Sequence, residues 1–204
     1  MEKYKTNSAW TEDRHLISIW IVEDDEDFQF LIQQTIEMET DMMVLGCSSS
    51  PEDALRNIPS HKPDIVLMDL NLNGSASDGM ETSRKLRLQT DSKILILTSF
   101  EDPDIVVRAA VRGLAHGYIF KSQFELLVET VRKTAQGVTP QQHMIHSLIL
   151  SCLTPAEYSV FQIMLGKELS LQSSPKTIAN QKTMVLKKLD LPSQSALLHV
   201  FRNS

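Results

Sequence analysis

The chain has 204 residues, enough for one medium-sized domain or two small ones, and its composition is that of an ordinary globular protein. No apolar stretch reaches the roughly 18 residues that a membrane span needs, the first residues contain no signal-peptide core, and two cysteines supply neither a disulfide framework nor a metal motif. We therefore expect a cytoplasmic protein with no membrane partner. Residues 1–150 carry a net charge of −9 and residues 151–204 one of +3, which hints that the second region approaches a polyanion.

Short apolar runs alternate with helical patterns over the first two thirds of the chain. The predicted strands cover residues 19–22, 44–47, 65–68, 94–97 and 118–120. Apolar residues at helical spacing predict helices over residues 28–38, from residue 50 onward, and over 78–88, 104–111 and 123–135. Apolar runs rich in β-branched residues are typical of buried parallel strands. The sequence thus predicts an α/β fold with a doubly wound, five-stranded parallel sheet.

A second, smaller unit follows this predicted sheet. Gly137 and Pro140 interrupt the pattern, and from residue 153 to the end only helical patterns occur. We predict an α/β domain over residues 16–136, a linker over 137–151 and a small all-α domain over 152–204. The linker contains His143 and His146, which we expect to be solvated rather than metal ligands. Residues 1–14 receive no assignment.

Polar side chains follow four of the predicted strands at the points where those strands end. They are Glu23 and Asp24, then Asp69, Thr98 and Lys121. Any one of them alone could be a helix cap or a surface charge. Together they would meet at the carboxyl edge of a parallel sheet, where ligands bind. Clustered carboxylates suit Mg²⁺, a carboxylate can attack a phosphoryl group, and a lysine and a hydroxyl can neutralise and bind its oxygens.

Residues 16–136 resemble the receiver domain of a bacterial two-component response regulator. The resemblance rests on the segments IVEDD, DIVLMDLNL, SDGMETSRKLR, ILILTS and AAVRGLAHGYIFK. It implies that Asp69 is the phosphoacceptor for a sensor histidine kinase, and that the backbone carbonyl of Asn71 joins the metal ligands. It also implies that Thr98 and Tyr118 move together as a switch, while Lys121 contacts the phosphoryl group. It implies a regulator that accepts and slowly loses a phosphoryl group, not a metabolic enzyme.

Two readings of the acidic segment are open, with either Glu23-Asp24 or Asp24-Asp25 as the metal-binding pair. We prefer Glu23-Asp24, because it places four apolar residues on the buried face of the following helix. These residues are Phe28, Leu31, Ile32 and Ile36. The loop after Asp69 departs from the receiver pattern, because Gly74–Ser77 forms a short extension before Asp78 and Gly79 open the next helix.

Residues from Leu153 onward resemble the helix-turn-helix domain of LuxR/FixJ-type regulators. Thr154, Pro155 and Glu157 have the pattern of a capping box, and Ser174 with Pro175 resembles the start of a recognition helix that buries Ile178, Val185 and Leu189. The segment between Gly166 and Thr177 is shorter than the family pattern and lacks much of the scaffold helix. The resemblance implies DNA contacts from Lys176, Thr177, Asn180, Lys182 and Lys187.

Two functional classes follow from these resemblances. In the first, the chain is a phosphorylation-dependent transcription regulator that dimerises and binds promoter DNA. In the second, the receiver is intact, but the shortened output domain signals through protein contacts without binding DNA. A metal-dependent phosphatase is disfavoured, because such enzymes typically carry a second acid two residues after the nucleophile, where this chain has Asn71.

Overall fold

The first part of the chain is a five-stranded parallel sheet with helices on both faces, as predicted. The structure, a computed structural model, describes residues 16–72, 74–170 and 174–201, so the unassigned segment 1–14 lies outside the described residues. The strand order is β2-β1-β3-β4-β5. The elements are β1 (Ile17–Val22), α1 (Glu26–Glu37), β2 (Met42–Ser48), α2 (Pro51–His61), β3 (Ile65–Asp69), α3 (Ala76–Gln89), β4 (Lys93–Thr98), α4 (Pro103–Arg112), β5 (Gly117–Phe120), the 3-10 helix η1 (Lys121–Leu126) and α5 (Leu127–Gln136).

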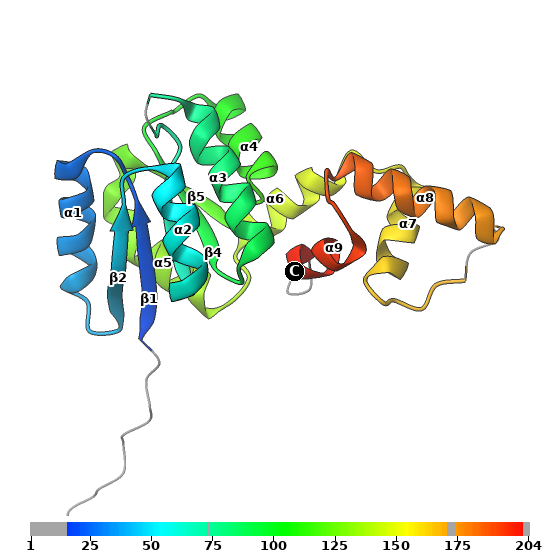
Figure 1. Cartoon of the computed structure of the whole chain (residues 1–204), viewed down its shortest axis with the longest axis horizontal. Helices are drawn as coiled ribbons and strands as arrows, with labels where there is room; N and C mark the ends of the chain where they lie inside the picture. Colours follow the sequence, from blue (N-terminus) through cyan, green and yellow to red (C-terminus); the bar gives the residue numbers. More distant parts are fainter. Residues whose placement is uncertain (1–15, 73, 171–173, 202–204) are drawn as a thin grey trace, which may run out of the picture.

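Alternation along the strands divides the side chains of the sheet between two layers of helices (Figure 1). Ile19 and Ile21 of β1 pack with residues of α1 and α5, whereas Trp20 and Val22 pack with residues of α2 and α3. Successive strand residues point to opposite faces, and both faces are covered, so the runs are apolar throughout. The central strand β3 is buried along its whole length, which fixes the end of that strand and its Asp69 in place.

Helix α1 begins after Asp25, whose side chain accepts a hydrogen bond from the Phe28 backbone N–H at 3.0 Å. Ile32 and Ile36 are buried, as predicted. The prediction of a buried Leu31 is wrong, because its side chain is 46% exposed. The buried stripe of α1 follows the spacing of residues 28, 32 and 36, and Leu31 lies beside it, where its side chain reaches solvent.

The second part of the chain is helical and extends the same apolar packing. Its helices are α6 (Pro140–Leu150), α7 (Pro155–Met164), α8 (Pro175–Lys188) and α9 (Gln194–Phe201). Helix α6 occupies most of the predicted linker and buries Ile145 and Ile149. These side chains belong to one cluster that reaches from Ala109 in α4 to Phe201 in α9. The prediction that His146 is solvated is wrong, because helix α6 turns it toward α9 and leaves it 8% exposed. Within the described residues, no helix is long and apolar enough to cross a membrane.

Helices α7 and α8 begin as the sequence predicts. Thr154 and Glu157 form a reciprocal capping box at the start of α7. Ser174 caps α8, and Val185 and Leu189 are buried as expected. Ile178 is only half-buried, because it follows directly on the exposed first turn of α8. Residues 167–170 between these helices are not helical, in keeping with the predicted loss of the scaffold helix, and residues 171–173 lie outside the described part.

Two arginines of α3 connect the sheet to the helical part, a contact that the sequence did not predict. Arg84 donates to the backbone carbonyl of Leu189 at 3.1 Å, and also to that of Asp190. Arg87 is buried and donates to the carbonyl of Val200 in α9 at 2.7 Å. The carbonyls at helix ends lack intrahelical donors, so a guanidinium is a suitable partner for them.

Candidate functional site: a carboxylate cluster at the sheet edge

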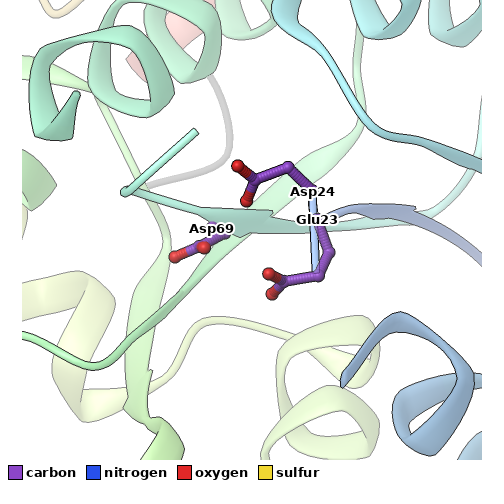
Figure 2. A group of neighbouring side chains, drawn as sticks. All are labelled: Glu23, Asp24 and Asp69. Atoms are coloured by element: carbon purple, nitrogen blue, oxygen red, sulfur yellow. The ribbon is translucent and has the colours of Figure 1, made fainter. Parts of the chain in front are cut away.

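The three acids predicted to share a metal site do lie together at the carboxyl edge of the sheet. One carboxylate oxygen from each of Glu23, Asp24 and Asp69 lies within 4.8 Å of the others. Glu23 and Asp24 follow β1, and Asp69 ends the neighbouring strand β3. Figure 2 shows the three carboxylates gathered around one region at the end of the sheet. Glu23 and Asp69 are buried and Asp24 is exposed, so the cluster is open to solvent on one side.

The neighbours of this cluster have separate positions. Asp25, the alternative member of the acidic pair, caps α1 instead of joining the cluster. Asn71 donates its backbone N–H to Asp69 Oδ1 at 3.2 Å, which holds the Asp69 carboxylate toward the loop. This arrangement agrees with the preferred Glu23-Asp24 register.

Lys121 contacts the two buried acids of the cluster. Its Nζ lies 2.7 Å from Glu23 Oε2 and 3.1 Å from Asp69 Oδ2, and it lies 4.4 Å from the centroid of the Phe28 ring. Burial acts to lower the pKa of Lys121. The hydrogen bond to Glu23 and the charges of Asp69 and Glu23 outweigh this effect and raise that pKa above its ordinary value. Lys121 is therefore protonated at neutral pH.

One lysine does not balance two buried carboxylates, and Glu23 shows the consequence. Burial raises the pKa of Glu23 to about 7, the negative charge of Asp69 adds to this effect, and the hydrogen bond from Lys121 opposes it. Glu23 and Asp69 together thus carry more negative charge than Lys121 neutralises. A divalent ion with a preference for oxygen ligands would supply the missing charge, so the residues present fit Mg²⁺.

Thr98 and Tyr118 lie on the two neighbouring strands β4 and β5. Thr98 is fully buried, and its Oγ1 accepts a hydrogen bond from the Phe100 backbone N–H at 3.0 Å. In the strand register Thr98 pairs with Phe120. Tyr118 is half-buried, and its ring contacts that of Phe120 edge to face at 5.5 Å between centroids. The predicted switch residues therefore lie on adjacent strands, and Phe120 pairs with Thr98 in the register and contacts the ring of Tyr118.

A residue that the sequence reasoning missed contacts this switch region. The side-chain amide of Gln141, in the first turn of α6, accepts from the Tyr118 backbone N–H at 3.2 Å and donates to the Tyr118 carbonyl at 3.3 Å. An added Cβ on Gly117 would lie 2.6 Å from the same amide oxygen. A lone glutamine in a predicted linker gives no sequence signal for such a contact.

Helix α3 packs tightly against the end of β3 through Gly79. A Cβ at Gly79 would lie 2.2 Å from the backbone oxygen of Asp69, so only glycine lets α3 approach this closely. Helix α3 begins at Ala76 rather than at the predicted Asp78, because the loop closes early by a bridge between Leu72 and Ser75. Residue 73, in this predicted extension, lies outside the described residues.

The predicted DNA-contacting residues lie on a different element, helix α8. Lys176, Thr177, Asn180 and Lys187 are exposed there, and Lys182 is half-buried. The C-terminal end of α8 is tied to α7, because Lys188 Nζ donates to Glu157 Oε2 at 2.7 Å and to the Cys152 carbonyl at 3.2 Å. The N-terminal half of α8 is thus accessible, whereas its C-terminal end is fixed by the hydrogen bonds of Lys188.

Comparison with known proteins agrees with this geometry. The family profile "Response regulator receiver domain" matches residues 19–132. The transcriptional regulatory protein DesR of Bacillus subtilis is 29% identical over 193 residues, which cover 88% of this chain and 93% of DesR. The response regulator GacA of Pseudomonas aeruginosa is 27% identical over 205 residues, which cover 89% of this chain and 94% of GacA.

Solved structures give the same result for the fold. A DNA-binding response regulator of the LuxR family from Staphylococcus aureus matches with a TM-score of 0.54 and 28% identity, covering 59% of this chain and 99% of that one. The RcsB response regulator of Salmonella enterica, solved on promoter DNA with a phosphomimetic, matches with a TM-score of 0.54 and 20% identity. This match covers 93% of this chain and 100% of RcsB. At 20% identity it supports a shared fold and nothing further.

Proposed function

Because the chain belongs to the response regulator receiver domain family, we propose that it is a two-component response regulator that controls transcription by binding DNA. A partner histidine kinase would phosphorylate it on Asp69. The observation that carries this proposal is the contact of Lys121 with both Glu23 and Asp69 at the carboxyl edge of the sheet. DesR is named a transcriptional regulatory protein and GacA a response regulator. A cytoplasmic location and a homodimer formed on phosphorylation are part of the same proposal.

The chemistry of the site follows from its charges. In the transfer, a carboxylate oxygen of Asp69 would form a bond to phosphorus while the bond between phosphorus and the donor histidine nitrogen breaks. Glu23, Asp24 and Asp69, with the backbone carbonyl of Asn71, would hold Mg²⁺, which neutralises charge on the phosphoryl oxygens. Lys121 already contacts Asp69 and would move with little displacement to a phosphoryl oxygen.

The switch would use the hydrogen bonds that the structure records. To reach a phosphoryl oxygen, the Thr98 hydroxyl would rotate its hydrogen toward the phosphate, since at present its oxygen accepts from Phe100. Displacement of Thr98 changes the space beside Phe120, its partner in the register, and therefore the packing of Tyr118. A phosphate that orders one of two arrangements of these residues is a known type of switch.

DNA binding would use the accessible part of α8. Lys176, Lys182 and Lys187 would contact phosphates, Thr177 would contact the backbone, and Asn180 could pair with an adenine edge. In this proposal residues 16–136 form the receiver, 137–151 the linker and 152–204 the output domain. The alternative is an output region that signals through protein contacts alone. It is supported by the non-helical segment 167–170, where a scaffold helix would be expected.

The deciding experiment is DNA binding by the full chain across a salt series, with and without beryllofluoride and Mg²⁺. The DNA is selected from a pool of random-sequence duplexes. Binding should strengthen with beryllofluoride and fall steeply with salt, since each lost phosphate contact reduces the salt slope by about one. Lys182→Ala should flatten that slope, with Lys85→Ala on α3 as the matched control.

Two results would contradict parts of the proposal. Mg²⁺-dependent labelling of Asp69→Asn by acetyl phosphate would show that Asp69 is not the phosphoacceptor. Absence of DNA binding in either state, with beryllofluoride still changing the oligomeric state, would favour the protein-contact alternative.

A further inference from the structure

The ring of Phe28 in α1 lies beside the acid cluster and contacts its lysine. The Nζ of Lys121 lies 4.4 Å from the centroid of this ring, within the distance at which the ring's quadrupole attracts an ammonium ion over its face. The side chain of Lys121 is only 19% exposed, and this attraction is stronger where the cation is shielded from water. The ring therefore helps to fix the ammonium group, together with the two carboxylates.

The carboxylates and the ring hold Lys121 in different ways. Its Nζ lies 2.7 Å from Glu23 Oε2 and 3.1 Å from Asp69 Oδ2, so two N–H donors are directed at the acids. An ammonium group has three such donors, which leaves one for a phosphoryl oxygen. The attraction between the ring and the cation does not depend on the charge of Asp69, which changes when Asp69 is phosphorylated. The ring is thus a neighbour that can hold Lys121 both before and after the transfer.

The ring of Phe28 is itself held in place from two elements. Its backbone N–H donates to the side chain of Asp25, the cap of α1, at 3.0 Å. Its ring contacts that of Phe124 edge to face at 5.5 Å between centroids, and Phe124 belongs to η1, which begins at Lys121. Both rings also pack against the apolar cluster that contains Ile19 of β1. Phe28 therefore connects α1, which follows the acidic pair, to η1, which carries the lysine.

We propose that Phe28 is a positioning residue for phosphoryl transfer, because its ring holds the Lys121 ammonium beside Asp69. This inference rests on the proposed function. In the transfer, a carboxylate oxygen of Asp69 forms a bond to phosphorus while the bond from phosphorus to the leaving group breaks, and Lys121 keeps its proton. Phe28 acts through Lys121 and not on the phosphoryl group. Without the ring, the ammonium settles toward Glu23, its closer partner, and is less often in place for a phosphoryl oxygen.

The first measurement is the rate at which acetyl phosphate, labelled in its phosphoryl group, phosphorylates the full chain with Mg²⁺ present. Phe28→Leu keeps an apolar side chain without a ring and should slow the labelling about fivefold, the effect of losing one partly shielded cation–π contact. Phe28→Tyr keeps a ring and should stay within about twofold of the wild type. Phe30→Leu, on the same helix and 64% exposed, is the matched control and should leave the rate unchanged.

A double-mutant cycle separates the positioning of Lys121 from a general effect on the fold. In a chain with Lys121→Met there is no ammonium to hold, so adding Phe28→Leu should change the labelling rate by less than about twofold. A merely structural role would slow labelling about fivefold in both backgrounds. Urea unfolding checks that each variant is folded, and Phe28→Met is the second ring-free variant if Phe28→Leu fails to fold.

A second readout needs neither Mg²⁺ nor a phosphoryl donor. Protons over the face of an aromatic ring resonate upfield, so NMR of the chain with isotope-labelled lysine should show the methylene protons next to Lys121 Nζ upfield of those of other lysines. The signal is assigned by its absence from Lys121→Met. Phe28→Leu should remove the upfield shift, and Phe28→Tyr should keep it.

The outcomes distinguish this inference from the proposed function. If the wild type is labelled on Asp69 and the folded ring-free variants are labelled equally fast, the role of Phe28 is overturned and the proposed function stands. An equal loss in the Lys121→Met background, an equal loss in Phe28→Tyr, or a Lys121 signal without an upfield shift would also overturn it. A wild type that takes up no label, or equal labelling of Asp69→Asn, would overturn the proposed function and the role of Phe28 together.

Discussion

Replacing Glu23 by glutamine should stabilise the metal-free protein above neutral pH, although it removes a short ion pair. Glu23 is 1% exposed and shares Lys121 with Asp69. Burial raises the pKa of Glu23 to about 7 despite that lysine, so its ionised form is a net cost to the folded state. Glutamine has nearly the same shape and carries no charge.

The magnitude follows from the pKa of Glu23. The difference between an ordinary value of 4.5 and about 7 corresponds to about 3 kcal/mol, at about 1.4 kcal/mol for each pH unit. Because the folded-state pKa lies above the unfolded one, the stabilisation from protonated Glu23 is fully present below pH 4.5 and is lost as the pH rises through 7. Relaxation of the neighbouring charges reduces the gain, so we expect about 1 to 3 kcal/mol for Glu23→Gln at pH 8 and little change at pH 4.5.

The assay is urea unfolding with EDTA at both pH values, with Glu101→Gln as the control for loss of one exposed carboxylate. The control should change stability by no more than about 0.5 kcal/mol. Adding Mg²⁺ at pH 8 should stabilise the wild type more than the Glu23 variant. If Glu23→Gln is destabilised equally at both pH values, the pair with Lys121 outweighs burial and the reasoning is refuted.

Three further predictions test the packing of the chain by unfolding measurements. Gly79→Ala should lower the free energy of unfolding by about 2 kcal/mol or more, because the new Cβ would lie 2.2 Å from a backbone oxygen. Gly137→Ala is the control and should be neutral, because its Cβ would meet nothing within 4 Å. Equal effects of the two substitutions would contradict the close approach of α3. Arg87→Met should cost about 1 to 3 kcal/mol by leaving a carbonyl in α9 without its donor, and unchanged stability would mean that water replaces the arginine. The pKa of His146 is lowered to about 4 by burial and by the charges of Arg87 and a second histidine, so its neutral form contributes stability above pH 6.5 that is lost as the pH falls toward 4. His146→Gln should therefore reduce the acid-induced loss of unfolding free energy by up to about 3 kcal/mol. Parallel pH profiles of stability for the wild type and the variant would contradict this.

The carboxyl-edge cluster could be predicted from the sequence because of how parallel sheets are built. Strands buried on both faces are continuous apolar runs, so the first polar residue after each run marks its end. Parallel strands of one sheet then bring these ends to the same edge, as the contacts of Lys121 after β5 with Glu23 after β1 and Asp69 of β3 show. Helix starts were less accurate, because a cap such as Asp25 lies a few residues before the first apolar position of its helix.

The contacts between the sheet and the helical part could not be predicted in this way. Periodicity tells which residues share a face of a helix, but not which segment, far along the chain, covers that face. Leu31 and His146 illustrate the two kinds of error, since the first was expected to be buried and is exposed, and the second was expected to be solvated and is buried. Arg87 reaches Val200 across 113 positions, a separation that local patterns do not describe.

Strand β5 connects these two regions physically. Lys121 follows its last residue and contacts the acid cluster, while the backbone N–H and the carbonyl of Tyr118 are both hydrogen-bonded to the side-chain amide of Gln141 in α6. Helix α6 in turn buries Ile145 and Ile149 in the cluster that also holds α7, α8 and α9. Close-packed interiors transmit small displacements, so we expect a shift of β5 at the acid cluster to be carried into α6 by hydrogen bonds and from α6 into the helical part by packing. A linker without structure would not connect the two regions in this way, so we expect any such coupling to depend on the helical state of residues 140–150.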